Sequence, residues 1–240
     1  MSSAATDAAN APALCVIVFA FNEAENIAHV LGEMRGWLEQ HEPSFELVFV
    51  DDGSTDDTSG AARAALAGAR FQVLRHEKNR GIGAAIKTAV RAASAPWVTF
   101  MPADGQIEPQ AIGTLRAAAR ADDIDVVFST YADRDDGFTR KLLSFGVRAL
   151  ITVVHGVRLH SDGPYLFRRR LFVPEQLPPD TFFLNFEFPI RVLASGARTT
   201  NVVINCRPRR AGSSKSTGWN RIAGVARDLV DLRVRRFLER

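Results

Sequence analysis

Acidic and amide side chains recur directly after the apolar runs of this chain. Asn22 and Glu23 follow the first run, Asp51 follows the second, and Asp104 and Gln106 follow the fourth. In an open parallel sheet the carboxyl ends of the strands meet at one edge, and ligands bind there. Capping of the next helix explains any one of these groups alone. Three groups together form an acidic rim, which capping does not require, so this edge is the candidate site.

Glycine-rich phosphate loops are a second possible source of chemistry. The chain contains neither GxxxxGK[ST] nor a GxGxxG after its first strand. This excludes a P-loop nucleotide site and a Rossmann dinucleotide site. Gly81 and Gly83 instead open a predicted helix after a short basic segment. They would allow a ligand to approach the backbone closely, although plain helix packing explains them equally well.

Strands and helices alternate regularly over the first half of the chain. Apolar, β-branched runs predict strands at residues 13–21, 45–50, 71–74, 97–101 and 124–130. Helical spacing of apolar residues predicts helices at residues 23–40, 56–67, 82–93 and 107–121. This alternation predicts an α/β fold whose mainly parallel sheet is flanked by helices.

The pattern changes after Tyr131. An apolar run at 142–157 fits a core helix or a membrane-facing helix equally well, and an arginine-rich stretch follows at 167–171. A helix is predicted at about 185–195, a strand at 200–206 and a final helix from Trp219. Repeats and Gly/Ser linkers are absent from the sequence, so we expect a single domain. Its expected parts are a flexible tail at 1–12, the main domain at 13–217 and an amphipathic helix at 218–240.

Composition excludes several functional classes. The chain has 240 residues, is 46% hydrophobic and carries a net charge of only +3, which fits a globular protein and argues against nucleic-acid binding. Cys15 and Cys206 fit neither a disulfide framework nor a zinc site, which favours a reducing compartment. The first residues are small and polar, without the basic and apolar segments of a leader, so we expect a cytoplasmic location.

Several motifs resemble those of one enzyme family. They lie at residues 16–27, 50–56, 79–85, 101–106, 140–144, 162, 167–168 and 207–215. Together they resemble the family 2 glycosyltransferases with the GT-A (Rossmann-like) fold, especially the polyprenol-phosphate sugar transferases typified by dolichol-phosphate mannose synthase. The resemblance implies inverting transfer of one sugar from a GDP- or UDP-activated donor to a polyprenyl (dolichyl or undecaprenyl) phosphate.

The resemblance also implies roles for individual residues. Catalytic roles fall to Asp104, Arg140, Arg168 and Glu187. The nucleotide-sugar donor would be bound by Phe21, Asn22, Glu23, Asp51, Gly53, Ser54, Gly81, Asp104 and Arg207. The acceptor phosphate would be bound by Arg140, Ser144, Arg168, Arg209 and Lys215. Arginine suits these positions because its planar fork bonds phosphate in a bidentate manner.

The implied cofactor is Mg²⁺ or Mn²⁺, held by Asp104 and Gln106. The family's usual metal motif is Asp-x-Asp, and here Pro102 stands at the first aspartate. One carboxylate binds a cation less firmly than two, so we expect diphosphate oxygens and water to complete the coordination shell. Metal affinity without nucleotide should therefore be weak.

The acceptor can be approached through its chemistry. A sugar hydroxyl normally needs a general base, whereas a lipid phosphate is already anionic at neutral pH. Relatives that build glycans carry an adjacent Glu-Asp pair for that purpose, but here Glu187 is followed by Phe188. Glu187 fits either a general base or a buried, paired structural acid. This favours a phosphate acceptor, with transfer to a glycan hydroxyl as the alternative.

The sequence also predicts where the protein acts. Apolar and arginine residues in the 142–157 run and in the last helix predict peripheral contact with the cytoplasmic face of a membrane. A solvated helix face explains the arginines equally well. A non-catalytic module that binds nucleotide sugars is a further alternative, suggested by Pro102. The retention of Asp104, Gln106 and Arg168 argues against it.

Overall fold

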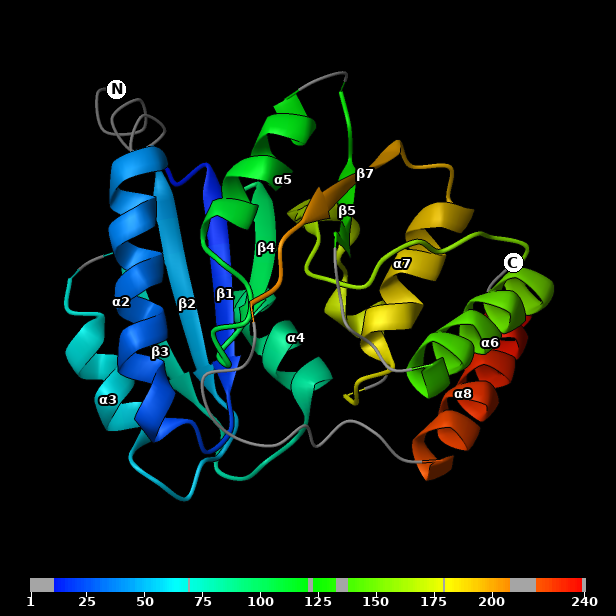
Figure 1. The fold of residues 1–240 in the computed structure, drawn as a ribbon, viewed down its shortest axis with the longest axis horizontal. Coiled ribbons are helices and arrows are strands. Elements are labelled where there is room, and N and C mark those ends of the chain that lie inside the picture. The colour runs from blue at the N-terminus through cyan, green and yellow to red at the C-terminus, as the bar shows by residue number, and fades with distance from the viewer. Residues whose placement is uncertain are drawn as a thin grey trace.

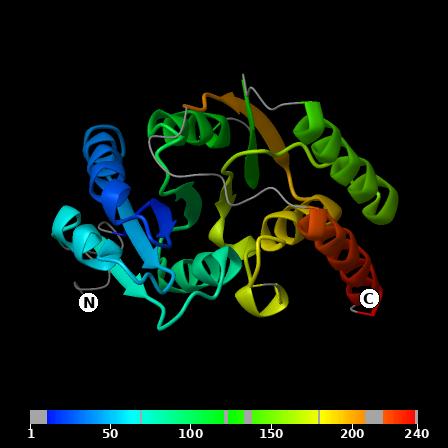
Figure 2. The ribbon, with the colours of Figure 1, turned by 60° about the horizontal axis from the view of Figure 1, so that its bottom comes forward.

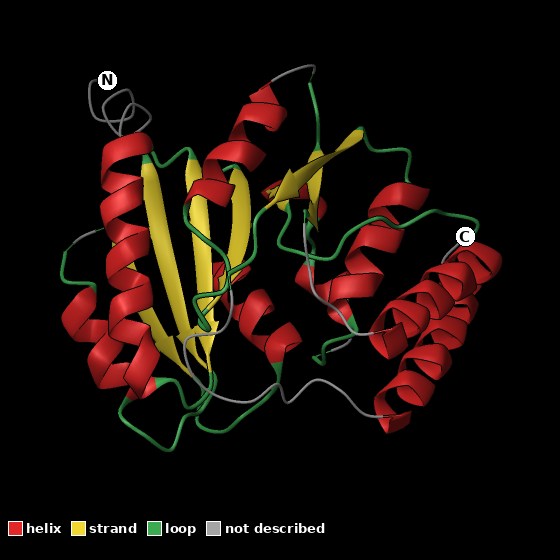
Figure 3. Cartoon of the chain, in the orientation of Figure 1, coloured by secondary structure: helices red, strands yellow, loops and turns green. Residues whose placement is uncertain are grey.

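The computed structural model describes residues 11–68, 70–120, 123–132, 138–178, 180–207 and 219–238. Side chains at 138–144 and 219–223 lie outside this description. The chain forms one α/β domain around a sheet of seven strands, which confirms the expected fold class (Figures 1 and 3). The strands are β1 (Leu14–Ala20), β2 (Phe45–Asp51), β3 (Phe71–Arg75), β4 (Trp97–Pro102), β5 (Val126–Tyr131), β6 (Leu166–Arg168) and β7 (Thr199–Ile204).

The sheet is parallel except for one strand. Its spatial order is β3-β2-β1-β4-β6-β5-β7, and β6 pairs antiparallel with both β4 and β5. All other pairs are parallel, so the carboxyl ends of β1, β2, β4, β5 and β7 lie at one edge. The arrowheads of the blue and cyan strands mark this edge in Figure 1. The polar groups that follow β1, β2 and β4 therefore meet there, as predicted.

Helices cover both faces of the sheet. One face packs against α2 (Ala24–His41), α3 (Thr58–Ala65) and α5 (Gln110–Arg120). The other packs against α4 (Ile82–Ala92) and α7 (Leu184–Ala194), with α6 (Phe138–His155) and α8 (Trp219–Leu238) at its outer end (Figure 2). Alternate residues of β1 enter the two cores, which explains why this strand is a continuous apolar run. Two short 3₁₀ helices, Arg169–Leu171 and Pro174–Gln176, connect β6 to α7.

Two elements differ from the sequence prediction. The helix expected from residue 107 begins at Gln110, because the carboxylate of Asp104 accepts the backbone N–H of Gln106 at 3.1 Å and holds a turn there. Strand β6 was not predicted, since three residues are too few for a period-2 pattern to be recognised.

Most of the apolar run at 142–157 lies in α6, which ends at His155 and packs against α7 and α8. Ile151 is fully buried in this contact, whereas Phe145 and Val153 are exposed. Of the helices in the described ranges, none is both long and apolar enough to span a bilayer.

Candidate active site

A cleft of about 280 Å³ opens at the carboxyl edge of the sheet. It lies between the ends of β1 and β4, the residue that follows β2, and the start of α4. Its lining residues are Phe19, Ala20, Phe21, Glu23, Asp52, Asn79, Gly81, Ile82, Ala85, Pro102, Ala103 and Asp104. Four predicted donor-site residues, Phe21, Glu23, Gly81 and Asp104, thus come together around one cavity.

Two loops at the cleft are tied together by reciprocal hydrogen bonds. The backbone N–H of Asn22 donates to the hydroxyl of Ser54 at 2.9 Å, and the side-chain oxygen of Asn22 accepts the N–H of Thr55 at 2.8 Å. Asn22 adopts φ +56°, a left-handed conformation that asparagine tolerates. Asn22 and Ser54 therefore shape the rim, and this geometry carries Phe21 and Glu23 into the cleft.

Gly53 is needed because the chain passes close by. A Cβ atom at this position would lie 2.3 Å from the carbonyl carbon of Lys78, and the residue has φ +76°. Any other residue would push the loop at 78–81 away from the strand end. The glycine thus sets the width of the cleft, although it does not line it.

The two aspartates after β2 have different roles. Asp51, predicted to bind the donor, is fully buried; its carboxylate accepts the N–H of Ser54 at 2.8 Å and a hydrogen bond from Ser59. Asp52 is the residue that lines the cleft. Because Asp51 ends the buried strand, its side chain turns into the protein, and the next residue is the first to face the cavity. The structure thus places Asp51 behind the site.

Asp52 organises the far wall of the cleft. One carboxylate oxygen accepts the backbone N–H of Arg80 at 3.0 Å, and the other accepts the N–H of Gly81 at 2.8 Å. The ring Nδ1 of His76 lies 2.7 Å from Asp52, and its Nε2 lies 2.9 Å from the hydroxyl of Thr88. A buried chain of hydrogen bonds therefore links β3 and α4 to the loop that carries Gly81.

The start of α4 is also held from the opposite side. The ammonium of Lys87, 6% exposed, donates to the carbonyl of Pro178 at 3.1 Å and to the carboxylate of Asp180 at 2.8 Å. Partial burial of the Asp180 carboxyl raises its pKa, but Lys87 and Arg80 outweigh this effect and hold the pKa below its ordinary value. Gly81 has φ +95°, and a Cβ there would lie 2.7 Å from the carbonyl oxygen of Asp180. The helix start is thus fixed between Asp52 and Asp180.

The residues expected to hold a cation fit in part. Asp104 is half-buried, lines the cleft beside Pro102 and presents a carboxylate, a hard oxygen ligand that suits Mg²⁺ or Mn²⁺. Gln106 lies outside the lining, and its amide nitrogen is 3.4 Å from the carbonyl oxygen of Arg207. Over the described ranges, no cluster of three or more His, Cys, Asp or Glu side chains has the arrangement of a metal site. A cation at Asp104 would depend on oxygens supplied by a diphosphate.

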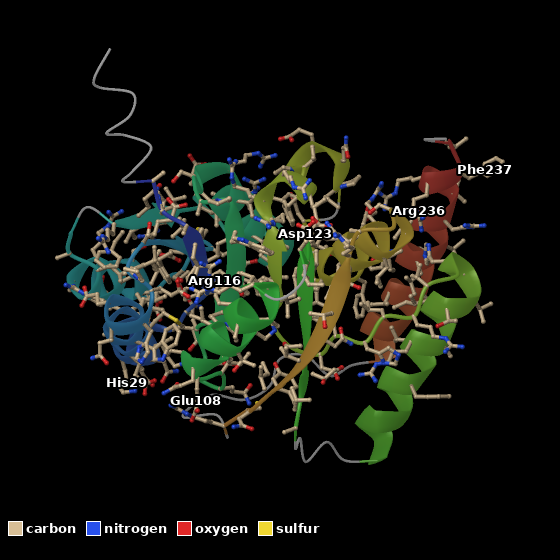
Figure 4. The ribbon with its side chains drawn as sticks, turned by 90° about the horizontal axis from the view of Figure 1, so that it is seen from above. His29, Glu108, Arg116, Asp123, Arg236 and Phe237 are labelled. Atoms are coloured by element: carbon tan, nitrogen blue, oxygen red, sulfur yellow. The ribbon has the colours of Figure 1, made fainter. Side chains whose placement is uncertain are left out.

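Arg207 lies next to this loop but binds protein carboxylates. Its backbone N–H donates to the carbonyl of Gln106 at 2.7 Å, while its guanidinium contacts Glu108 at 2.5 Å and Glu33 at 3.3 Å. Hydrogen bonding to Glu108 and then to Glu33 raises the pKa of the guanidinium above its ordinary value. The ring Nε2 of His29 lies 3.5 Å from the carboxylate of Glu33. Figure 4 shows His29 and Glu108 on the same side of the molecule. In this arrangement the charge of Arg207 is already neutralised.

Arg168 does not join the site. It is paired with Trp97 at the amino end of β4, because β6 runs antiparallel, and its guanidinium carbon lies 4.1 Å from the centre of the Trp97 ring. Asp104 follows the other end of β4, roughly 16 Å further along at about 3.3 Å per residue. The structure therefore places Arg168 at the end of β4 opposite the cleft, and its contact with an acceptor phosphate stays a prediction.

Glu187 is a buried member of an ion-pair cluster. It is 0% exposed, accepts two hydrogen bonds from Arg235 of α8 at 2.9 and 2.8 Å, and accepts one from Arg191 at 2.9 Å. Of the two roles left open by the sequence, this geometry is that of a paired structural acid. A general base needs an accessible lone pair beside the substrate. Glu187 instead joins α7 to α8.

The remaining predicted residues lie outside the described side chains. Arg140 and Ser144 fall in the first half of α6, where only the helical backbone is described. Arg209 and Lys215 fall in the undescribed segment 208–218. Their roles stay predictions.

Asp52 and His76 are the site residues that sequence reasoning missed. Neither residue is among those to which a role was assigned from the sequence. Asp52 could have been found from the apolar run before it. Such a run predicts a parallel strand that is buried along its whole length, and the first residue after that strand faces the edge where ligands bind. No comparable local signal marks His76, because its partners lie 24 and 12 residues away.

Comparison with known proteins places these features in context. The model of the family described as "Glycosyl transferase family 2" matches residues 15–188. The chain is 28% identical to the dodecaprenyl-phosphate galacturonate synthase of Rhizobium johnstonii over 62% of its own length and 45% of that protein. It is 29% identical to the undecaprenyl-phosphate 4-deoxy-4-formamido-L-arabinose transferase of Sodalis glossinidius, over 65% of its own length and 49% of that protein. The chain thus spans about half the length of these curated relatives.

A solved structure shares the fold. Glucosyl-3-phosphoglycerate synthase from Mycobacterium tuberculosis, in complex with Mn²⁺, uridine diphosphate and glucosyl-3-phosphoglycerate, aligns with a TM-score of 0.67. The match covers 95% of this chain and 80% of that chain, at 22% sequence identity. It supports the expected GT-A arrangement of the sheet and its helices.

Proposed function

The chain belongs to glycosyl transferase family 2, and we propose that it transfers one sugar, with inversion, from a nucleotide sugar to a polyprenyl phosphate. The observation that carries this proposal is the cleft at the carboxyl edge of the sheet, where Phe21, Glu23 and Asp104 meet. Relatives whose names specify dodecaprenyl and undecaprenyl phosphate support the choice of acceptor.

The donor is proposed to bind across the cleft. Phe21 offers an aromatic face to the base, and Glu23 accepts hydrogen bonds from ribose hydroxyls or the base. Asp104 is proposed to hold Mg²⁺ or Mn²⁺, which when bound would neutralise charge on the departing diphosphate. The loop fixed by Asp52 brings the backbone at Gly81 to the opposite wall. These residues position the donor before reaction, so little reorganisation is needed.

The acceptor is proposed to be an anion. An oxygen of the lipid phosphate attacks the anomeric carbon from the face opposite the diphosphate, forming one C–O bond as the other breaks. The diphosphate leaves with the electron pair, and no proton has to be removed from the nucleophile. The burial of Glu187 between Arg191 and Arg235 supports this choice, because a hydroxyl acceptor would need a base.

The proposed place of action is the cytoplasmic face of a membrane. A polyprenyl chain lies in a bilayer, so its phosphate is presented at the surface. Cys15 and Cys206 are both free thiols, which suits a reducing compartment.

The test is a donor screen with matched acceptors. Release of nucleoside diphosphate is measured from GDP-mannose, UDP-glucose and UDP-N-acetylglucosamine, each with a short polyprenyl phosphate and with the corresponding polyprenol as control. We expect one donor to be turned over with the phosphate and none with the alcohol. Transfer to a glycan hydroxyl with no response to polyprenyl phosphate contradicts the acceptor assignment. Donor binding without any transfer indicates a non-catalytic module.

A further inference from the structure

The loop that joins β4 to α5 carries Asp104, and the residues of this loop alternate in exposure. Asp104, Gln106 and Glu108 are half-buried, whereas Gly105 and Ile107 between them are buried. Ile107 belongs to the core on one face of the sheet. The carboxylate of Asp104 accepts the backbone N–H of Gln106 at 3.1 Å, and Gly105 adopts φ +67° in the turn between them. The core therefore anchors one side of the loop, and the three polar side chains stay accessible to other segments.

A segment from the far edge of the sheet reaches this loop. Strand β7 ends at Ile204, and both β6 and β5 lie between β7 and β4 in the sheet. Figure 1 shows the chain after β7 running back towards the loop that follows β4. There the backbone N–H of Arg207 donates to the carbonyl of Gln106 at 2.7 Å, and the side-chain amide nitrogen of Gln106 lies 3.4 Å from the carbonyl oxygen of Arg207. Residues 106 and 207 are thus joined by reciprocal contacts outside the sheet.

The guanidinium of Arg207 extends this connection to two helices. Its Nε donates to the carboxylate of Glu108, just before α5, at 2.5 Å, and its Nη1 donates to the carboxylate of Glu33 in α2 at 3.3 Å. All three side chains are about one-third exposed, so solvent screens these charges only in part. Arg207 therefore holds the loop at residue 106 through its backbone and at residue 108 through its side chain, and it ties both points to α2.

The position of Arg207 does not favour a direct contact with the donor. Arg207 is outside the set of residues that line the cleft, and two of its three guanidinium nitrogens already donate to carboxylates. A phosphate would have to displace two charge-assisted hydrogen bonds, which are the strong class. It would also be repelled by Glu33 and Glu108. The bonds of Arg207 are those of a residue that supports the loop.

The loop needs support because Asp104 is its only carboxylate between residues 102 and 106. A cation held by one carboxylate and by diphosphate oxygens depends on where that carboxylate lies, since small displacements from a productive geometry are costly. The bond from Asp104 and the bond from Arg207 meet at residue 106: Asp104 accepts its N–H, and Arg207 donates to its carbonyl. Movement of Gln106 would therefore move Asp104.

We propose that Arg207 is a positioning residue: by fixing the backbone of Gln106, it holds the carboxylate of Asp104 in place for a divalent cation that binds together with the donor diphosphate. This role is indirect, and it replaces the donor contact that the family resemblance implies for Arg207. The proposal rests on the proposed function in one respect, namely that a cation binds at Asp104.

The first experiment measures the binding of Mn²⁺ without turnover. Electron paramagnetic resonance reports the free Mn²⁺ in mixtures of the full chain with UDP or with GDP. Arg207→Gln should weaken Mn²⁺ binding by about tenfold or more, and Arg207→Lys, which keeps one positive charge beside the carboxylates, should recover part of the loss. Arg91→Gln is the matched control, because Arg91 pairs with Glu175 at the surface.

The direction of the change in Mn²⁺ binding is diagnostic. Loss of the positive charge of Arg207 would, by charge alone, attract the cation and tighten its binding. Loss of support for Asp104 weakens it. Tighter or unchanged Mn²⁺ binding by Arg207→Gln overturns the proposal.

Nucleotide binding in EDTA separates this role from a direct contact with the donor. Calorimetry with UDP and with GDP is carried out in EDTA and again with Mn²⁺. We expect Arg207→Gln to bind nucleotide as the wild type does in EDTA and more weakly than the wild type with Mn²⁺. A direct contact predicts weaker binding by Arg207→Gln in EDTA, and tighter binding by Glu108→Gln because the guanidinium is then freer. Either of these two results overturns the proposal.

A double-mutant cycle tests whether Arg207 acts through Asp104. When Asp104→Asn is already present, Arg207→Gln should change nucleotide binding with Mn²⁺ by less than about twofold, because the group that it positions is gone. Losses that add in the double variant overturn the proposal.

Glu108→Gln covers the case in which Arg207→Gln does not fold. It removes one ion pair of the guanidinium and leaves the backbone bond between residues 207 and 106 without its side-chain support. Hydrogen exchange at the backbone amide of Arg207 should therefore accelerate by about tenfold or more. An unchanged exchange rate in Glu108→Gln overturns the proposal.

Turnover separates this proposal from the proposed function. If the variants change Mn²⁺ binding as expected but the wild type transfers no sugar to polyprenyl phosphate, the function is contradicted and the positioning role stands. If the wild type transfers sugar and Arg207→Gln does so equally well at every Mn²⁺ concentration, the positioning role is contradicted and the function stands.

Discussion

The buried carboxylates Asp52, in the first half of the chain, and Glu187, in the second half, serve different purposes. In the first half, Asp52 accepts the backbone N–H groups of Arg80 and Gly81, and Glu46 accepts those of Ser94 and Ala95. In the second half, Glu187 accepts hydrogen bonds from the guanidinium groups of Arg191 and Arg235. A carboxylate bonded to backbone N–H groups fixes the path of a loop, whereas one bonded to arginines joins two helices. Place in the topology therefore decides the role of an acid better than residue type does.

The largest expected effect concerns Glu187. Glu187→Gln leaves Arg191 and Arg235 without their partner, so the free energy of unfolding should fall by about 3 kcal/mol, the lower end for a broken buried pair because both arginines are partly exposed. At temperatures where the variant is folded, kcat with polyprenyl phosphate should stay near the wild-type value. Urea unfolding and initial rates check the two expectations.

Glu175→Gln is the control, because Glu175 is exposed and pairs with Arg91 at the surface. Its stability should not change measurably. If Glu187→Gln abolishes transfer while leaving stability unchanged, Glu187 is a base and the contrast between the two halves fails.

Asp104 gives the next largest effect. Asp104→Asn removes the carboxylate in the cleft and should lower kcat by at least about 10²-fold, the scale of losing a positioned electrostatic stabiliser. Wild-type activity should also be lost with EDTA and return with Mn²⁺ or Mg²⁺. Pro102→Asp should lower the metal concentration needed for half-maximal rate. Undiminished rates for Asp104→Asn and in EDTA would exclude a cation at this position.

The predicted site residues show which parts of the site can be inferred from the sequence. The placement of Glu23 and Asp104 was predictable because each follows a parallel strand, and parallel strands end at one edge. Phe21 was identified through the family resemblance alone. The position of Arg168 at the far end of β4 was not predictable, because β6 runs antiparallel and is three residues long, so its direction has no local signature. The partner of Glu187 in α8 lies 48 residues away in the sequence. Contacts that join distant segments through side chains are not encoded by periodicity.

His76 allows a test of how Asp52 fixes the loop at Gly81 in the first half of the chain. His76→Ala removes the hydrogen bond to Asp52, which frees the loop at Gly81, so the KM for the donor should rise about tenfold while kcat changes less. His76→Asn should recover part of this loss, because its amide nitrogen occupies the place of Nδ1. Thr88→Val is the control for the Nε2 side and should change KM little. A role confined to stability would lower the unfolding free energy and leave KM unchanged in all three variants.

The smallest expected effect is a dependence of the free energy of unfolding on pH, caused by His155 in the second half of the chain. Burial, and then the nearby Arg236 and Arg233, lower the pKa of His155 below its ordinary value, although the hydrogen bond to Leu229 opposes this shift. As pH falls below about 6.5 the unfolded chain takes up a proton that the folded chain does not. The free energy of unfolding should therefore decrease on acidification and be unaffected by His155 at pH 8.

His155→Gln tests this dependence. Amide hydrogen exchange in α8 should accelerate between pH 8 and pH 5.5, after correction for the intrinsic rate, and the acceleration should be smaller in the variant. An identical pH dependence in both proteins would assign the effect to other groups.

The place of β6 between β4 and β5 has a consequence for synthesis on the ribosome. The strands β1 to β4 pair with one another, so these pairs can form as soon as residue 102 has emerged, and the second edge of β4 waits for β6. Strand β5 pairs with β6 and β7, both of which come later in the chain. Until residues 166–204 emerge, β5 has two open edges that favour pairing with other nascent chains. Premature termination between β5 and β6 should therefore yield a product that aggregates through the edges of β5, whereas a stop after β7 leaves both of these edges paired.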